Sequence, residues 1–232
     1  MSGLTVTSVG RKRFFPGRDI FLECPFSVTS VPSGHWTLLS HVSYGACMAA
    51  NEGRHRLGPS GGRLTLRTYR SGLAAQAGHD LTIEITQWSG ELDGDDGAPD
   101  RLEVRINLDS LVVREGAGGL KPLTDRDRRE IALTARKQLQ ADRYPEATFT
   151  AAQFAPDDTG GGRINGTLVL RGQSHPLTLT VSKAGEGRYR ATATVVQSEF
   201  GIKPYSGMFG ALKLRDAVDV EVDIGLSAAG HD

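Results

Sequence analysis

The chain has 232 residues, of which 38% are hydrophobic, and its 27 Lys and Arg balance 27 Asp and Glu. A net charge of zero lacks the basic excess of proteins that bind duplex DNA, and no stretch approaches the roughly 18 apolar residues of a membrane-spanning helix. The 29 glycines against 10 prolines favour tight turns and β structure. The composition predicts a soluble globular protein with no transmembrane segment and no nucleic-acid partner.

Residues 1–58 differ from the rest of the chain. They contain both cysteines, Cys24 and Cys47, and their apolar residues keep no regular period. We interpret them as an N-terminal extension of uncertain order, in which two free thiols are favoured over a disulfide. Met1–Val6 lacks the basic and apolar regions of a secretory signal, which predicts a cytoplasmic location.

From about residue 62 onward, apolar residues alternate with polar ones. Leu102, Val104 and Ile106 follow a period of two, and the same period returns in residues 81–86 and 218–224. This period is typical of a strand with one buried face. Further β-rich runs span residues 63–69, 148–154, 164–170, 177–181 and 188–196. About eight strands joined mostly by short links predict an antiparallel sandwich or barrel.

One segment between these strands is helical instead. Thr124 is a typical N-cap residue, and carboxylates follow it in the first turn, where they suit the positive end of a helix dipole. Ile131, Ala135 and Leu139 then recur every four residues, until Pro145 interrupts the pattern. We expect a single helix that is long enough to cover one end of a barrel.

Motifs that would carry catalysis or a metal are missing from the sequence. Ser71, His79 and Asp80 do not make a triad, because adjacent side chains on a strand point to opposite faces. The six histidines are scattered, with neither a His-x-x-x-His pair nor a Cys-x-x-Cys motif. The sequence therefore predicts a protein that is not an enzyme, with no metal and no cofactor.

An eight-stranded barrel encloses an interior just wide enough for packed side chains or for one slender ligand. With apolar inward faces, that interior suits an extended lipid tail. The pattern alone leaves open the alternative that side chains fill the interior.

Four segments, in this order along the chain, match the motifs of one known family. Leu108–Leu111 looks like its acidic-Ser-Leu turn, and Leu139–Phe149 is similar to its F-x-x-x-x-Y-P-x-x-x-F stretch. Ile164–Gly172 resembles its v-x-G-x-L-t-l-x-G hairpin, and Ser198–Ile202 resembles its R-x-x-F-G-i element. The chain from about residue 62 to 226 thus resembles the YceI-like family of lipocalin-like polyisoprenoid-binding proteins. It departs from the family at Leu139, where the family often has Phe, and at Gln197 and Ser198, where it often has Arg.

The resemblance implies that residues 59–232 form an all-β, eight-stranded antiparallel lipocalin-like barrel with one helix capping an end. It further implies non-catalytic binding, transport or sequestration of a long-chain isoprenoid-type lipid, polyprenyl or quinone-like, in the barrel interior. An enzyme acting on a barrel-bound lipid, or a packed barrel that serves as an interaction module, is the alternative. A homodimer is left open.

Candidate ligand-binding residues come partly from the matched motifs. Three phenylalanines lie on or beside them, although core packing would equally account for each. Three more aromatic residues are added because large amphipathic rings suit a pocket mouth, and one histidine because it could hydrogen-bond a head group. The seven candidates are Phe149, Phe154, Phe200, Trp88, Tyr205, Phe209 and His79.

Overall fold

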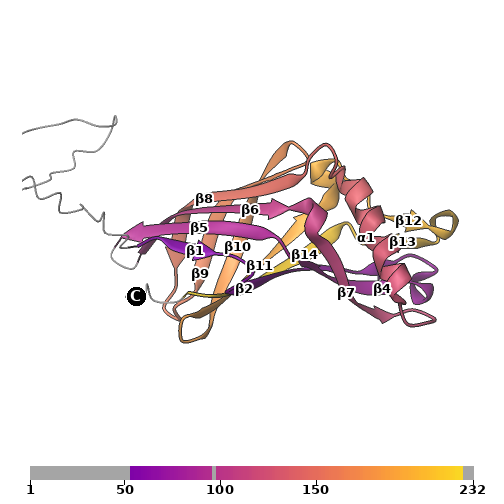
Figure 1. The fold of residues 1–232 in the computed structure, drawn as a ribbon, viewed down its shortest axis with the longest axis horizontal. Coiled ribbons are helices and arrows are strands. Elements are labelled where there is room, and N and C mark those ends of the chain that lie inside the picture. Colours follow the sequence, from indigo (N-terminus) through magenta and orange to yellow (C-terminus); the bar gives the residue numbers. More distant parts are fainter. Residues whose placement is uncertain (1–52, 96–97, 227–232) are drawn as a thin grey trace, which may run out of the picture. The chain divides into compact units, whose positions relative to one another are not determined.

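The computed structural model describes residues 53–95 and 98–226 (Figure 1). The expectations for residues 1–52, including those for Cys24 and Cys47, lie outside the described residues. Strand pairing already begins at His55, so the sheet includes the last residues of the segment that the sequence assigned to the extension.

Most of the described chain is β structure. Its strands are β1 (His55–Leu57), β2 (Gly62–Thr68), β3 (Arg70–Ser71), β4 (His79–Ile85), β5 (Trp88–Asp95), β6 (Ala98–Asn107), β7 (Leu111–Gly118), β8 (Glu146–Pro156), β9 (Gly162–Leu170), β10 (Gln173–Gly185), β11 (Arg188–Val196), β12 (Ser206–Gly207), β13 (Leu212–Leu214) and β14 (Ala217–Gly225). The helices are α1 (Asp125–Leu139) and the short 3-10 turns η1 (Ala75–Ala77), η2 (Leu108–Ser110), η3 (Gln197–Phe200) and η4 (Met208–Gly210).

The main sheet is antiparallel and strongly curled, in the order β1-β5-β6-β8-β9-β10-β11-β14-β2-β4-β7. Three of its strands are bent into two halves. β1 and β2 run along β5 and β4, so that His55 pairs with Leu92 and Thr68 pairs with Leu81. β4 and β5 run in turn along β7 and β6. β14 pairs with β2, and β2 pairs with β4. Since β4 continues into β5, which is near the start of the strand order, the curled sheet closes on itself.

The prediction of an eight-stranded antiparallel barrel with one helix is confirmed, although the strand count differs in detail. The described residues contain fourteen strands. Counting each bent pair once leaves eight segments in the curled sheet, and β3, β12 and β13 form a small separate sheet. The bend between β4 and β5 lies against η2, the turn between β6 and β7. Ser110 of η2 accepts hydrogen bonds from the backbone N–H groups of Thr86 and Gln87 at 3.2 and 3.0 Å.

The residues that the period of two predicts to face inward are buried in the structure. Leu81, Ile83 and Ile85 are all buried, as their period of two predicts. β11 has the predicted bounds, residues 188–196. β10 is longer than the predicted 177–181, because its polar ends pair with β9 and β11 and need no apolar residues to do so.

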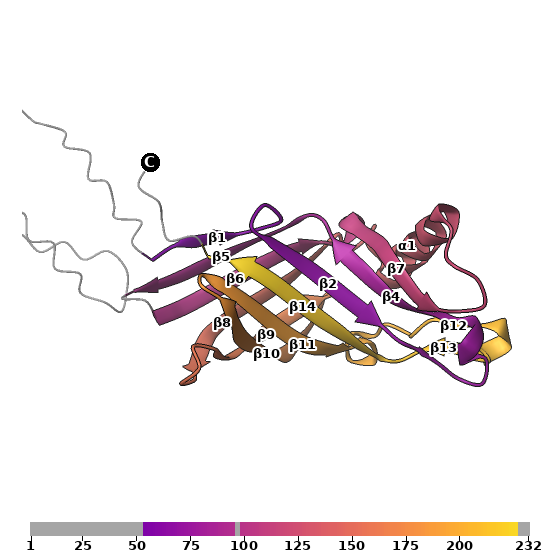
Figure 2. The same cartoon turned by 90° about the horizontal axis from the view of Figure 1, so that it is seen from below.

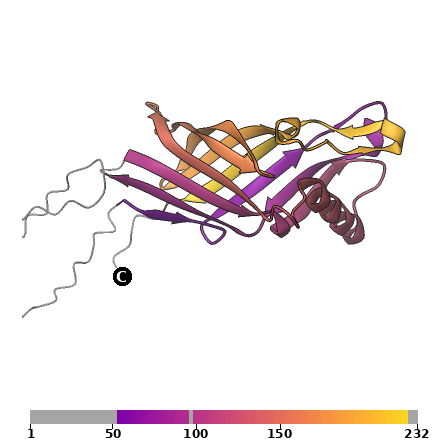
Figure 3. The ribbon, with the colours of Figure 1, turned by 90° about the horizontal axis from the view of Figure 1, so that it is seen from above.

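The helix is confirmed, and it closes one end of the curled sheet beside β7 (Figures 1 and 3). The Thr124 N–H donates to the Asp127 carboxylate at 2.8 Å, and the Asp127 N–H donates to the Thr124 hydroxyl at 3.2 Å. The helix ends at Leu139, and the C-cap residue Gln140 has a φ of 52°, in the left-handed region. Ile131 and Leu139 pack against the buried residues of the sheet.

Candidate ligand-binding cavity

A cavity of about 1930 Å³ lies inside the curled sheet. Every strand of that sheet and α1 contribute to its wall. Small-molecule pockets are commonly about 300–1,000 Å³, so this interior has room for a ligand larger than a drug-sized molecule. The volume argues against the packed-barrel alternative, in which side chains would fill the same space.

The wall is apolar through the middle of the cavity. Ile83, Leu102, Leu168 and Val220 are typical members, each on a different strand. Val220 packs against both groups of buried residues in the fold, so it lies between the two halves of the core. A continuous hydrocarbon surface of this kind binds apolar chains without directional contacts.

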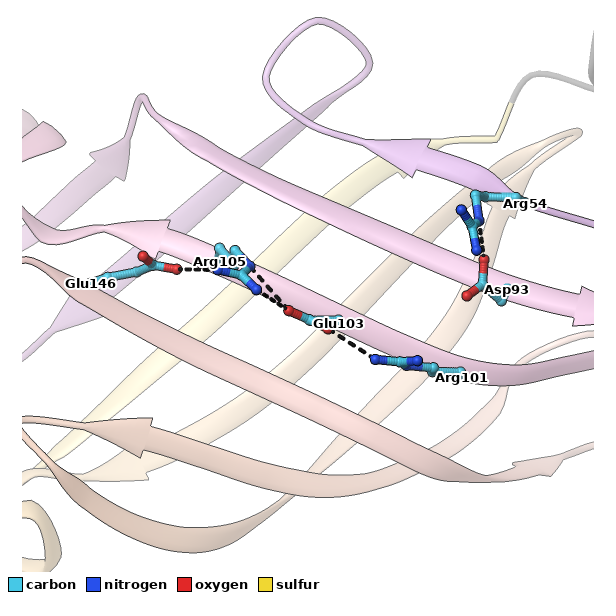
Figure 4. A network of polar contacts seen from close by, with 6 residues as sticks. All are labelled: Arg54, Asp93, Arg101, Glu103, Arg105 and Glu146. Carbon is cyan, nitrogen blue, oxygen red and sulfur yellow. Dashed lines mark hydrogen bonds and ion pairs between the residues drawn. The ribbon is translucent and has the colours of Figure 1, made fainter. Parts of the chain in front are cut away.

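Charged residues of the same strands point outward and pair with one another (Figure 4). On β6, Glu103 contacts Arg101 at 3.2 Å and Arg105 at 2.7 Å, and Arg105 lies 3.8 Å from Glu146. The hydrogen bond from Arg105 holds the pKa of Glu103 below its usual value. Exposed pairs of this type contribute little stability, but they show that alternation along the strands separates charge outside from hydrocarbon inside.

Polar side chains line the cavity near α1. Arg70 Nη1 donates to the Gly78 carbonyl at 2.8 Å, and its Nε lies 3.8 Å from Asp80. His79 Nε2 lies 2.8 Å from the Lys121 carbonyl. A carbonyl only accepts, so Nε2 donates to it, and Nδ1 is the ring nitrogen left for another partner. This end therefore offers polar side chains to a polar group.

Two buried polar atoms in the wall lack a hydrogen-bond partner among residues 53–95 and 98–226. They are Thr68 Oγ1 and Trp88 Nε1, in side chains that are 8% and 7% exposed. A buried donor without a partner costs about 1–3 kcal/mol. Thr68 lies at the α1 end of β2, whereas Trp88 lies near Gly62 at its other end. Neighbouring protein atoms cover both of these polar atoms, so neither reaches a molecule in the cavity as the side chains stand.

The structure places five of the seven predicted residues in the cavity wall: Trp88, Phe149, Phe154, His79 and Tyr205. The other two candidates, Phe200 and Phe209, do not line it. Phe200 is buried with its ring 4.9 Å from that of His175, edge to face, and Phe209 is fully exposed.

Sequence reasoning missed Thr68 and Arg70, both of which line the cavity. The signal that could have found Thr68 is the alternation of β2, in which it follows the inward-facing Leu64 and Leu66. Arg70 carries no such signal, because its place depends on β3 and β4 meeting in space.

Comparison with known proteins gives the family. The model of the YceI-like domain matches residues 64–226. This chain belongs to that family. A UPF0312 protein of Shewanella baltica is 28% identical over 128 residues, which cover 51% of this chain and 62% of the relative. A UPF0312 protein of Pseudomonas savastanoi is 24% identical over 125 residues, 50% of this chain and 60% of that one. The match thus spans less than two thirds of these relatives.

One solved structure supports the same fold, and a second aligns with a lower score. BcnA of Burkholderia cenocepacia aligns with a TM-score of 0.54 at 15% identity, over 72% of this chain and 96% of that one. A polyisoprenoid binding domain from Saccharophagus degradans aligns with a TM-score of 0.46 at 12% identity, over 76% and 99% of the two chains. At 15% identity, the likeness to BcnA extends to the fold alone.

Two further findings concern the part of the chain that the structure describes. None of its helices has the length and hydropathy needed to cross a membrane. Its His, Cys, Asp and Glu side chains form no group of three or more that could hold a metal ion.

Proposed function

We propose that this protein binds an isoprenoid-type amphiphile, polyprenyl or quinone-like, and carries or sequesters it without catalysis. The observation that supports this function is the 1930 Å³ cavity with its apolar wall. Burying a chain of about 20 carbons contributes on the order of 10 kcal/mol, at about 0.8 kcal/mol per methylene, before the cost of ordering the chain.

The polar groups near α1 favour one orientation of the ligand. Arg70 can donate to a carbonyl or hydroxyl head group, and His79 Nδ1 can hydrogen-bond an alcohol. The hydrocarbon chain then extends through the apolar middle toward Trp88.

Native mass spectrometry of freshly purified protein is the first test. We expect a long-chain amphiphile bound to the full chain, and a 1:1 complex after delipidation and titration with geranylgeraniol. Trp88 fluorescence in a Trp36→Phe background should change in the same titration, because Trp88 lines the cavity. Protein that purifies without a ligand and ignores added prenyl lipids would contradict the proposal.

A substitution at His79 distinguishes a lipid carrier from an enzyme that acts on the bound lipid. In a carrier, His79→Ala weakens binding of a prenyl alcohol and leaves the lipid chemically unchanged in both proteins. Conversion of the bound lipid by the wild type, lost in His79→Ala, would instead favour an enzyme acting on a barrel-bound lipid.

A further inference from the structure

Exposed large apolar side chains gather at one end of the described fold. Five of the six lie on three chain segments, residues 70–79, 117–123 and 203–215, which we call the rim; the sixth, Leu133, is on α1. The rim residues are Leu73, Leu120, Tyr205, Met208 and Phe209. In Figures 1 and 2 these segments lie around β12, β13 and η1, at the end of the sheet away from β1.

The three rim segments contact one another. β13 pairs with β3, so that Lys213 lies opposite Ser71, and the Ala74 N–H donates to the Ala211 carbonyl at 2.9 Å. The His79 ring contacts the Lys121 carbonyl. The rim is therefore one continuous surface. The cavity reaches it, because Arg70, Lys121, Tyr205 and Leu212 line the cavity as well.

The rim carries only positive charges. It contains no Asp or Glu, in a chain whose total charge is zero. Arg70 lies near Asp80, but no carboxylate among the described residues is within ion-pair distance of the other four cations. The five cations are Arg70, Lys121, Lys203, Lys213 and Arg215.

Phe209 is presented to solvent by an uncommon turn. Met208 and Phe209 have φ values of 49° and 54°, in the left-handed region that large side chains seldom adopt. Two consecutive residues of this kind leave the Phe209 ring fully exposed, although burial would stabilise the fold. Retained strain and an exposed ring favour a function at this surface.

We propose that the rim is a docking surface for an anionic lipid bilayer. Apolar tips that enter the interface, flanked by lysine and arginine that attract anionic head groups, are what peripheral membrane-binding surfaces combine. A second copy of this chain fits less well, because two rims would bring ten cations together. That the bound lipid exchanges with the bilayer at the rim rests on the proposed function. Docking of the rim to the bilayer does not depend on it.

The test is co-sedimentation of the full chain with vesicles of phosphatidylcholine alone or mixed with phosphatidylglycerol. We expect binding that requires phosphatidylglycerol and weakens with salt. Leu73→Ser with Phe209→Ser should lower vesicle affinity at least about tenfold, since each ring or leucine loses its burial. Lys203→Gln with Lys213→Gln should lower it about 25-fold, at roughly fivefold per basic residue near an anionic surface.

A matched control lies at the other end of β14, in the β10–β11 hairpin. Lys183→Gln with Arg188→Gln removes two exposed cations there and should leave rim docking intact, with no more than the small loss expected of distant charges. All variants should bind geranylgeraniol in solution as the wild type does, so failure to dock and failure to carry lipid are distinguishable.

Three results would overturn the proposal. The wild type could ignore both kinds of vesicle, or the rim variants could bind them as tightly as the control. Light scattering could also show a dimer that the apolar rim variant dissociates, which would assign the rim to a second copy of this chain.

Discussion

Narrowing the middle of the cavity tests the hollow interior directly. Val220 lines the cavity and contacts both halves of the core, so Val220→Trp places an indole across the path of a bound chain. If the larger side chain displaces roughly four ligand methylenes, binding loses about 3 kcal/mol at 0.8 kcal/mol each, which raises Kd more than about 100-fold.

The stability of the ligand-free variant is the second half of the same prediction. An extra ring in a packed core costs about 1–3 kcal/mol, but a cavity of 1930 Å³ has room for it. We therefore expect an unchanged or slightly raised Tm for delipidated Val220→Trp. Isothermal titration with geranylgeraniol measures the affinity, and thermal unfolding followed by circular dichroism measures the Tm.

Thr192→Trp is the matched control, because Thr192 is an exposed residue of β11, one register position from Val220's partner on the adjacent strand. It should keep both affinity and Tm. The reasoning is refuted if Val220→Trp binds the prenyl alcohol as the wild type does while its Tm falls, since the interior would then be filled and the ligand would bind elsewhere.

Three further predictions concern stability. A Cβ at Gly166 would lie 2.5 Å from a backbone carbonyl oxygen of β8, so Gly166→Ala should lower the free energy of unfolding by about 1–3 kcal/mol. Gly58→Ala is the control, because the nearest atom to its Cβ would lie 3.5 Å away, and it should leave the stability unchanged. Equal urea midpoints for the two variants would contradict this prediction. Thr124→Ala should cost about 1 kcal/mol of helix capping at neutral pH. The Thr124 hydroxyl lowers the pKa of Asp127. The difference in Tm between the wild type and Thr124→Ala should therefore shrink as the pH falls through that lowered pKa. A difference in Tm that does not depend on pH would contradict this prediction. Tyr69 donates to a β14 carboxylate, which raises its pKa above the ordinary 10.0. This hydrogen bond should contribute its full stability below about pH 10, and the contribution should be lost as the pH rises through the raised pKa of Tyr69. An ultraviolet titration in which every tyrosine ionises at the ordinary pKa would argue against this prediction.

The sequence predicted the elements because their signals are local. The alternation of Leu81, Ile83 and Ile85 and the capping residues of α1 depend only on neighbours along the chain. Phe149 and Phe154 were indicated by the matched motifs and not by periodicity, because they lie five positions apart and a period of two would place them on opposite faces. The register shift between Ala151 and Gln153 brings both into the cavity wall. The motifs did not give the position of Phe200, which lies in a 3-10 turn and packs outside the cavity wall.

By itself, the amino-acid order determined an all-β chain of about eight antiparallel segments, one capped helix and apolar inward faces. Tertiary structure decided that these faces enclose a cavity, since an interior volume depends on how β14 meets β2 across about 150 residues of chain and on where the three bent strands turn. It also decided that residues 70–79, 117–123 and 203–215 form one rim. Exposure and charge on a shared surface arise from segments that are distant in sequence, and no local period encodes their meeting.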